Sequence, residues 1–173
     1  MAEDLTRTVA AAVWRSAVEE ALAEGYTFVD WLTAVDRTYA DEPGFEVIVR
    51  LLDLSTPGSA RAVRISTLVP EGASLQSLTP VRAGFAFHER ETYEMFGISF
   101  EGFVDGTDLG LRPLLLPDGF EGNPLRKDFQ LAARASKTWP GGKEPGEGHD
   151  SVKSPSRRRV QAPGVPAPEW GPR

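Results

Sequence analysis

The stretch HERETYEMFG, residues 88–97, holds the side chains with the greatest potential for chemistry. Glu89 and Glu91 are carboxylates of the kind that general acid–base catalysis uses, and His88 is a possible metal ligand. On a helix, however, residues two apart point about 200° away from each other, so the two carboxylates do not face one substrate. A zinc-protease helix needs a second histidine four residues after the first, where this chain has Thr92. The spacing therefore disfavours both a two-carboxylate hydrolase and a zinc site.

Other motifs that carry chemistry are missing from the sequence. The second of the two histidines, His149, falls in a Pro/Gly-rich stretch, and the glycines of PGGKEPGEG lack the spacing and the Lys-Ser/Thr ending of a phosphate-binding loop. There is no G-x-G-x-x-G, no nucleophile elbow and no cysteine for a disulfide, a thiolate zinc site or an iron–sulfur cluster. Nothing in the composition or the spacing of residues therefore demonstrates an active site.

Glu89 is the charged residue of this stretch that most needs an explanation. Helical spacing places Phe85, Thr92 and Phe96 in one narrow apolar arc, and Glu89 falls inside it. A buried, ionised carboxylate costs several kcal/mol unless donors or a cation meet it. Glu89 is therefore either a general acid or base with a raised pKa, or a buried group paired with a partner that locks the helix in place. The other charged residues of the motif are expected on the polar side, with Arg90 and Glu94 as an i, i+4 pair.

The size and charge of the chain favour one acidic folded body with appendages. The 173 residues carry a formal net charge of −6, which argues against general nucleic-acid binding. Residues 130–173 hold eight Lys and Arg against four Asp and Glu, a balance of +4, whereas residues 1–129 hold 11 against 21, a balance of −10. The acidic start of the chain does not resemble a signal peptide, and no apolar run is long enough to span a membrane. A cytoplasmic protein is expected.

Hydrophobic periodicity predicts an α+β fold: a single domain with an N-terminal helix, a mostly antiparallel sheet, and a second helix that carries the Glu-Arg-Glu motif. The first helix is expected at residues 4–24, ending at Gly25. A turn at residues 29–31 and a strand at 32–36 follow. Strands at 45–54 and 61–70 form an antiparallel hairpin, and the second helix covers residues 81–96 and ends at Gly97.

The sequence after this body predicts a long extended C-terminal segment. We divide the chain into an α+β body at 1–100, an extended segment at 101–138 and a Pro/Gly-rich tail at 139–173. Prolines recur too often in LRPLLLPDGFEGNPLRKDF for a helix or a central strand, yet its Leu and Phe side chains are too apolar to stay in water. We expect the segment to lie along a partner protein, and the tail to be disordered in isolation.

Two blocks of sequence resemble a known family. HERETYEMFGISFEG and LRPLLLPDGFEGNPLRKDF are similar to the signature of the 30-kDa (C-type) subunit of proton-pumping NADH:quinone oxidoreductase, or respiratory complex I. WLTAVD at residues 31–36 adds to the resemblance, which covers roughly residues 5–130, and the end of the chain looks like those of actinobacterial members. The chain departs from the family at Phe103, where members usually have a histidine, and at FAFHERE.

The resemblance implies a non-catalytic structural subunit of the peripheral arm, with no catalytic, cofactor-binding or metal-binding residue in this chain. It implies that the complex carries FMN and iron–sulfur clusters and uses NADH and a quinone, and that this chain contacts the 49-kDa-type (D-type) subunit at the quinone site and the small iron–sulfur (B-type) subunit. It also implies a peripheral position on the cytoplasmic face of the cell membrane. The alternatives are the equivalent subunit of a related membrane-bound hydrogenase-type complex, or a scaffold module outside respiration.

The matched motif positions are the residues expected at partner interfaces or in structural contacts. Glu89 is expected to pair with Arg112 or Arg126, and Arg90 and Glu91 to fix the helix end or meet a partner. The charged contacts with the quinone-site subunit are assigned to Arg126, Lys127 and Asp128, and Phe129 is expected to anchor the turn. The complete set is Glu89, Arg90, Glu91, Glu94, Gly97, Arg112, Pro117, Pro124, Leu125, Arg126, Lys127, Asp128 and Phe129.

Overall fold

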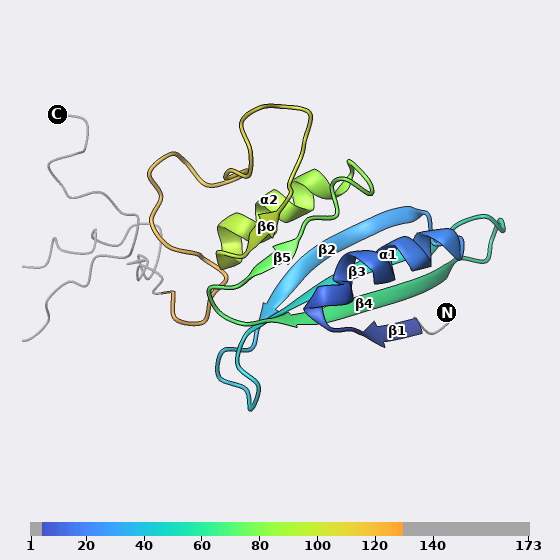
Figure 1. Cartoon of the computed structure of the whole chain (residues 1–173), viewed down its shortest axis with the longest axis horizontal. Coiled ribbons are helices and arrows are strands. Elements are labelled where there is room, and N and C mark those ends of the chain that lie inside the picture. The colour runs from blue at the N-terminus through green and yellow to red at the C-terminus, as the bar shows by residue number, and fades with distance from the viewer. Residues whose placement is uncertain (1–4, 130–173) are drawn as a thin grey trace, which may run out of the picture.

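A computed structural model describes residues 5–129 of the chain, and the predicted tail at 139–173 lies outside this range. Figure 1 shows the elements in space. In chain order they are β1 (Leu5–Thr8), the 3₁₀ turn η1 (Ala11–Val13), α1 (Trp14–Ala23), β2 (Phe28–Asp36), β3 (Phe45–Asp53), β4 (Arg61–Val69), β5 (Ser74–Gln76), α2 (Phe85–Phe96) and β6 (Ser99–Glu101).

The main sheet has four strands in the order β1-β4-β3-β2. The β3–β4 hairpin is antiparallel, as the alternation of apolar residues predicts, and Val49 faces Ile65 at its centre. β2 also pairs with β3 in the antiparallel sense, whereas β1 runs parallel to β4 at the opposite edge. The expected α+β fold with a mostly antiparallel sheet is confirmed.

One face of this sheet holds the core. Phe45, Val47, Val49 and Leu51 of β3 are at most 1% exposed, while the residues between them are only partly covered. α1 packs on this buried face with Trp14 and Val18, and in Figure 1 it lies across β3 and β4. α2 reaches the same face near β2, where the Phe96 ring lies edge-on to Phe45 with 6.3 Å between the centroids. The two helices therefore share one hydrophobic core.

The predicted helix at residues 4–24 is wrong over its first third. Residues 5–8 form β1, because Leu5 and Thr8 pair with Val63 and Ser66 of β4, and the amide of Val9 donates to the Ser66 carbonyl at 2.9 Å. Over so short a stretch the sequence LTRT fits both a helical and a strand periodicity. Its strand conformation results from pairing with a strand almost 60 residues later in the chain. The α-helix itself begins only at Trp14.

Two further element boundaries differ from the prediction. The turn expected at 29–31 is a β-bulge, so β2 begins at Phe28 rather than at residue 32. α2 begins at Phe85 rather than at residue 81, because the amides of Val81 and Arg82 both donate to the carbonyl of Leu78 and hold residues 78–83 in turns. A small parallel sheet of β5 and β6, the strands on either side of α2 in the sequence, was not predicted.

Candidate partner interface

α2 places the motif residues, and Gly97 ends the helix as predicted. Gly97 adopts a left-handed conformation with φ 75°, and its amide donates to the Tyr93 carbonyl at 2.8 Å. A Cβ atom at this position would lie 2.8 Å from Asn123 Oδ1 and 2.9 Å from Arg126 Nη2. Both the backbone conformation and the closeness of the C-terminal segment therefore favour glycine here.

Glu89 is fully buried, and its partners are not the predicted arginines. Its Oε1 accepts from the Leu78 amide at 2.5 Å and its Oε2 from the Ser77 hydroxyl at 2.6 Å. Burial raises the pKa of Glu89 to about 7, although these two hydrogen bonds and the charge of Arg15 favour the ionised form. The carboxylate therefore attaches α2 to the loop before it.

Arg112 and Arg126, the predicted partners of Glu89, make other contacts. Arg112 Nη1 lies 2.7 Å from Asp105 Oδ2, and Arg126 Nη1 lies 2.9 Å from Glu71 Oε1. The predicted pairing of Glu89 with either arginine is therefore wrong. Sequence spacing could not identify Ser77 and Leu78 as the partners, because the donors are a small hydroxyl and a backbone amide on an irregular loop.

Glu94 was expected on the polar side of α2, and this expectation is also wrong, since Glu94 is only 3% exposed. Its carboxylate accepts from three successive backbone amides of the C-terminal segment: Leu114 at 2.7 Å, Leu115 at 2.9 and 3.0 Å, and Leu116 at 3.1 Å. Successive N–H groups that converge on one anion form a favourable binding geometry for negative charge. The partner of Glu94 is thus a backbone, which side-chain patterning does not reveal.

Arg90 holds the same segment from the neighbouring helical position. Its Nη2 donates to the Pro113 carbonyl at 2.6 Å and its Nε to the Arg112 carbonyl at 3.2 Å. Arg90 therefore meets the carbonyls of residues 112–113, while Glu94 meets the amides of residues 114–116. The two motif residues do not form the expected i, i+4 pair but bind opposite polar groups of one extended stretch.

The end of α2 is covered by a later part of the same segment. The Asn123 amide group donates to the Glu94 carbonyl at 2.9 Å, the Leu125 backbone amide to the Met95 carbonyl at 3.1 Å, and Arg126 Nε to the Phe96 carbonyl at 2.6 Å. The last carbonyls of a helix have no partner within the helix, and a cation is favourable beside them. The Arg126 guanidinium also lies 4.8 Å from the centre of the Phe45 ring.

The remaining predicted residues lie at the surface of this assembly. Glu91, Pro117, Lys127 and Asp128 are exposed, and Pro124 is partly covered. The Lys127 backbone amide donates to Asp36 Oδ2 at 2.8 Å, and hydrogen bonds from Thr38 and Lys127 outweigh burial to lower the pKa of Asp36. The Phe129 ring stacks on Phe120 with 6.1 Å between the centroids.

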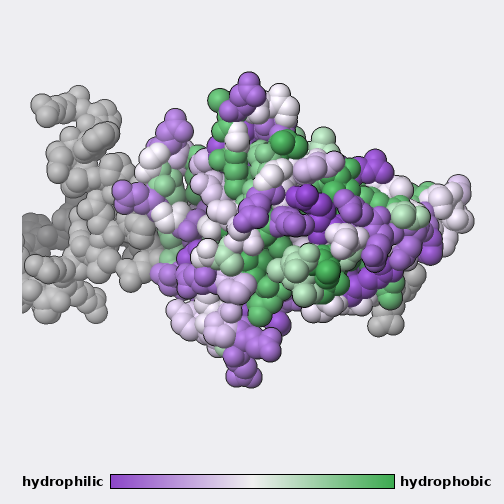
Figure 2. Space-filling view, viewed as in Figure 1, coloured by the Kyte–Doolittle hydropathy of each residue, from purple (hydrophilic) through white to green (hydrophobic). Residues whose placement is uncertain are grey.

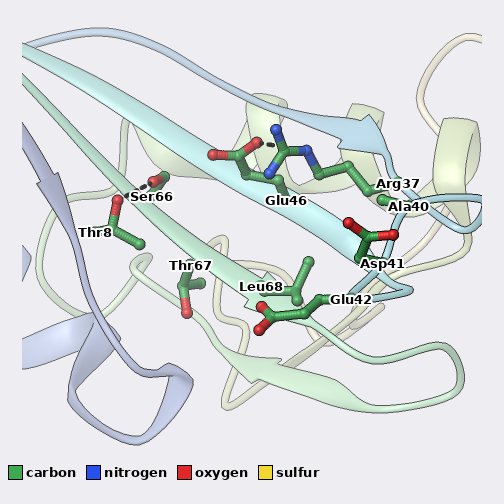
Figure 3. A pocket seen from close by; sticks show the side chains of 9 residues that line it. All are labelled: Thr8, Arg37, Ala40, Asp41, Glu42, Glu46, Ser66, Thr67 and Leu68. Atoms are coloured by element: carbon green, nitrogen blue, oxygen red, sulfur yellow. Dashed lines mark hydrogen bonds and ion pairs between the residues drawn. The ribbon is translucent and has the colours of Figure 1, made fainter.

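Shallow grooves lie beside the C-terminal segment and on the hairpin. One of about 300 Å³ lies between α2 and the segment and is lined by Tyr93, Glu94 and residues 113, 116–120, 122 and 123. The other, of about 350 Å³, lies on the far side of the hairpin and is shown in Figure 3. There Arg37 Nε is 3.2 Å from Glu46 Oε2, with Asp41 and Glu42 nearby. Within residues 5–129 no group of three or more His, Cys, Asp or Glu is arranged to hold a metal ion.

The geometry defines an α+β protein whose charged motif binds the backbone of its own C-terminal segment. The chain belongs to the family described as "Respiratory-chain NADH dehydrogenase, 30 Kd subunit", whose sequence model matches residues 7–135. The resemblance seen in the two sequence blocks is thereby confirmed.

Individual relatives agree with the family. The chain is 39% identical over 109 residues to the mitochondrial NADH-ubiquinone oxidoreductase 30.4 kDa subunit of Neurospora crassa, covering 63% of this chain and 35% of that protein. It is 44% identical over 90 residues to the C-type subunit of the NADH-quinone oxidoreductase of Agrobacterium fabrum, covering 52% and 41%. The match thus spans less than half the length of these relatives. A solved trypsin-resistant fragment (1–134) of Nqo5 has the same fold, with a TM-score of 0.51, 24% identity and coverage of 58% and 80%.

Proposed function

We propose that the chain is a structural subunit of the peripheral arm of a proton-translocating NADH:quinone oxidoreductase, and that it binds neighbouring subunits rather than a substrate. The family match over residues 7–135 is the observation that carries this proposal. In this proposal the FMN and iron–sulfur clusters belong to other subunits, which pass electrons from NADH to the quinone. The subunit sits peripherally on the cytoplasmic face of the cell membrane through its complex. No helix among residues 5–129 is long and apolar enough to cross a bilayer.

The proposed contact surface lies on α2 and the segment that follows it. Large apolar side chains that are more than half exposed gather on these elements: Phe87, Val104, Leu109, Leu115 and Leu125. In Figure 2, hydrophobic and hydrophilic residues lie beside one another on the loop that projects above α2 in Figure 1. Apolar side chains on a rigidly held backbone are good anchors, because little conformational entropy is lost when they bind.

Arg90 and Glu94 support this surface by fixing the backbone of residues 112–116. The exposed side chains of Lys127 and Asp128 then supply the charged contacts with the quinone-site subunit, and the small iron–sulfur subunit adjoins the same region. Permanent interfaces of this kind bury roughly 2,000 Å² or more in total.

Affinity purification of the tagged full-length chain from its native membranes tests the proposal. The expected result is a complex with bound flavin, iron–sulfur subunits and NADH:quinone oxidoreductase activity. Recovery of a hydrogenase-type complex, or of soluble partners without a quinone reductase, would overturn it.

A pair of variants tests the surface in the same purification. Leu115→Asp places a charge at the proposed contact, and Leu54→Asp makes the same change at a comparably exposed leucine after β3. Leu115→Asp is expected to reduce recovery of the other subunits about tenfold or more, since an unpaired buried charge costs several kcal/mol. Leu54→Asp should leave recovery unchanged. Equal recovery with the two variants would exclude the proposed surface.

A further inference from the structure

Glu89 is linked to the C-terminal segment through two buried hydroxyl groups. Its Oε2 lies 2.6 Å from Ser77 Oγ, Ser77 Oγ lies 2.7 Å from Thr79 Oγ1, and Thr79 Oγ1 accepts from the Val104 amide at 2.8 Å. Val104 follows β6, at the point where the chain leaves the body and begins the segment that returns to α2. These four groups form what we call the Glu89 hydrogen-bond chain.

When Glu89 is ionised, the two ends of the Glu89 hydrogen-bond chain fix which group donates and which accepts in each of its hydrogen bonds. A carboxylate only accepts, and a backbone N–H only donates. Ser77 must therefore donate to Glu89, and Thr79 must donate to Ser77, which leaves a lone pair of Thr79 Oγ1 free for the Val104 amide. The Thr79 amide also donates to Ser77 Oγ at 3.1 Å. Every donor in the chain is then matched by an acceptor.

A proton on Glu89 disturbs this arrangement. The Leu78 amide already points at Oε1, so the added proton belongs on Oε2 and is directed at Ser77. The Ser77 hydroxyl must then donate to Thr79 Oγ1 instead of to Glu89. The Thr79 hydroxyl, which had donated to Ser77, thereby loses its acceptor within the Glu89 hydrogen-bond chain. An unmatched buried hydroxyl is costly, so Thr79 is expected to rotate away from the Val104 amide. The Val104 side chain is exposed, so water can reach the released amide.

We propose that Glu89 makes the attachment of the C-terminal segment respond to protons: proton uptake by its carboxylate reverses the Glu89 hydrogen-bond chain and releases the amide of Val104. Among the elements packed against Glu89, α1 contributes the charge of Arg15, whose Nε donates to the Ser77 carbonyl at 2.9 Å. The loop at 77–79 contributes only hydroxyls and amides.

The direction in which amide protection changes with pH distinguishes a proton-responsive attachment of the segment from a purely structural role of Glu89. Because burial raises the pKa of Glu89, the native state as a whole gains stability on protonation. A core amide such as that of Val49 in β3 should therefore become better protected as the pH falls. The Val104 amide should become less protected over the same range. Opposite signs at the two positions cannot arise from a change in global stability alone.

Hydrogen exchange of the full-length chain, followed residue by residue by NMR at pH 6 and pH 8, tests the proposal. After correction for the intrinsic rates, the Val104 protection factor is expected to be about tenfold lower at pH 6, the effect of one lost hydrogen bond. Glu89→Gln should keep Val104 poorly protected at both pH values, because the amide group donates to Ser77 as the protonated acid does. The exposed Glu91→Gln is the matched control and should behave as the unmodified chain.

Thr79→Val provides a second variant that leaves Glu89 intact. It removes the hydroxyl link, so Val104 protection should be low and independent of pH, whereas the protection of Val49 should still rise as the pH falls. The proposal is overturned if Val104 and Val49 change in the same direction in the unmodified chain. It is equally overturned if the pH dependence at Val104 survives in Glu89→Gln or Thr79→Val.

Discussion

The carboxylate of Glu94 lies 2.7 Å from the amide nitrogen of Leu114, and this contact ties the charged motif of α2 to a segment 20 residues later. The two amides that follow point at the same carboxylate. One side chain thus accepts hydrogen bonds from three successive backbone amides that lie outside any helix or strand. The position of the apolar side chains around them depends on this single acceptor.

Replacing Glu94 by alanine is expected to release residues 112–117 from α2. Three partly buried amides lose their acceptor, and we expect the free energy of unfolding to fall by about 2–3 kcal/mol. Limited chymotrypsin digestion of the full-length chain should show faster cleavage after Leu114 and Leu115, the leucines whose amides lose their acceptor. Glu91→Ala, which removes an exposed carboxylate three residues earlier, is the control. Unchanged cleavage after Leu114 and Leu115 in Glu94→Ala would show that the segment is held by other contacts.

Gly97→Ala tests whether the end of α2 needs space as well as backbone freedom. Gly119 has almost the same φ, 77° against 75°, but nothing lies within 4 Å of a Cβ built there. Gly119→Ala should therefore cost only the backbone conformation, about 1 kcal/mol. Gly97→Ala should cost about 1–3 kcal/mol more, since its methyl group meets Asn123 and Arg126. Chemical denaturation of both variants gives the difference directly, and equal losses would contradict the close contact.

The stability of the chain should depend on pH through Glu89. Its pKa is about 7 in the folded protein and close to 4.5 when unfolded, so the folded state holds the proton more tightly. The corresponding stabilisation is complete below pH 4.5 and is lost as the pH rises through 7, a change of about 3 kcal/mol. Urea unfolding between pH 5 and 8 should show this loss relative to Glu89→Gln, which cannot titrate. Parallel pH curves for the two proteins would rule it out.

Arg126→Lys is expected to destabilise the protein although it conserves the charge. Lysine cannot reproduce both the Nε bond to the Phe96 carbonyl and the planar contact over Phe45. We expect a loss of about 1–2 kcal/mol, measured by thermal or urea unfolding. Lys127→Arg, at a residue that contacts Asp36 through its backbone amide, should change little. A neutral Arg126→Lys substitution would mean that charge alone matters at this helix end.

The core of the fold follows from the sequence because its signals are local. Alternation in FEVIVRLLDL identifies β3 and its buried face, and glycine at position 97 identifies the end of α2. β1 was missed because its four residues gain their strand conformation from β4, far along the chain. Short segments with ambiguous periodicity are decided by such distant pairing rather than by propensity.

The site was only partly predictable for a related reason. The sequence singles out Glu89, Arg90 and Glu94, and it correctly places Glu89 among buried residues. Their partners are peptide groups and a serine, which have no distinctive pattern, so the charge-to-charge pairing with Arg112 or Arg126 was wrong. Helical projection also cannot foresee that an outward-facing Glu94 becomes buried under a segment that folds back over it.

The bond between the Lys127 amide and Asp36 joins residues 91 positions apart. Asp36 ends β2 in the first quarter of the chain and is almost completely covered. During synthesis the carboxylate of Asp36 can form its hydrogen bond with the Lys127 amide only after the ribosome has released the chain beyond Lys127. A truncated product that stops short of that point would keep the two Thr38 hydrogen bonds to Asp36 Oδ1 but would leave Asp36 Oδ2 without its backbone donor at the margin of the core.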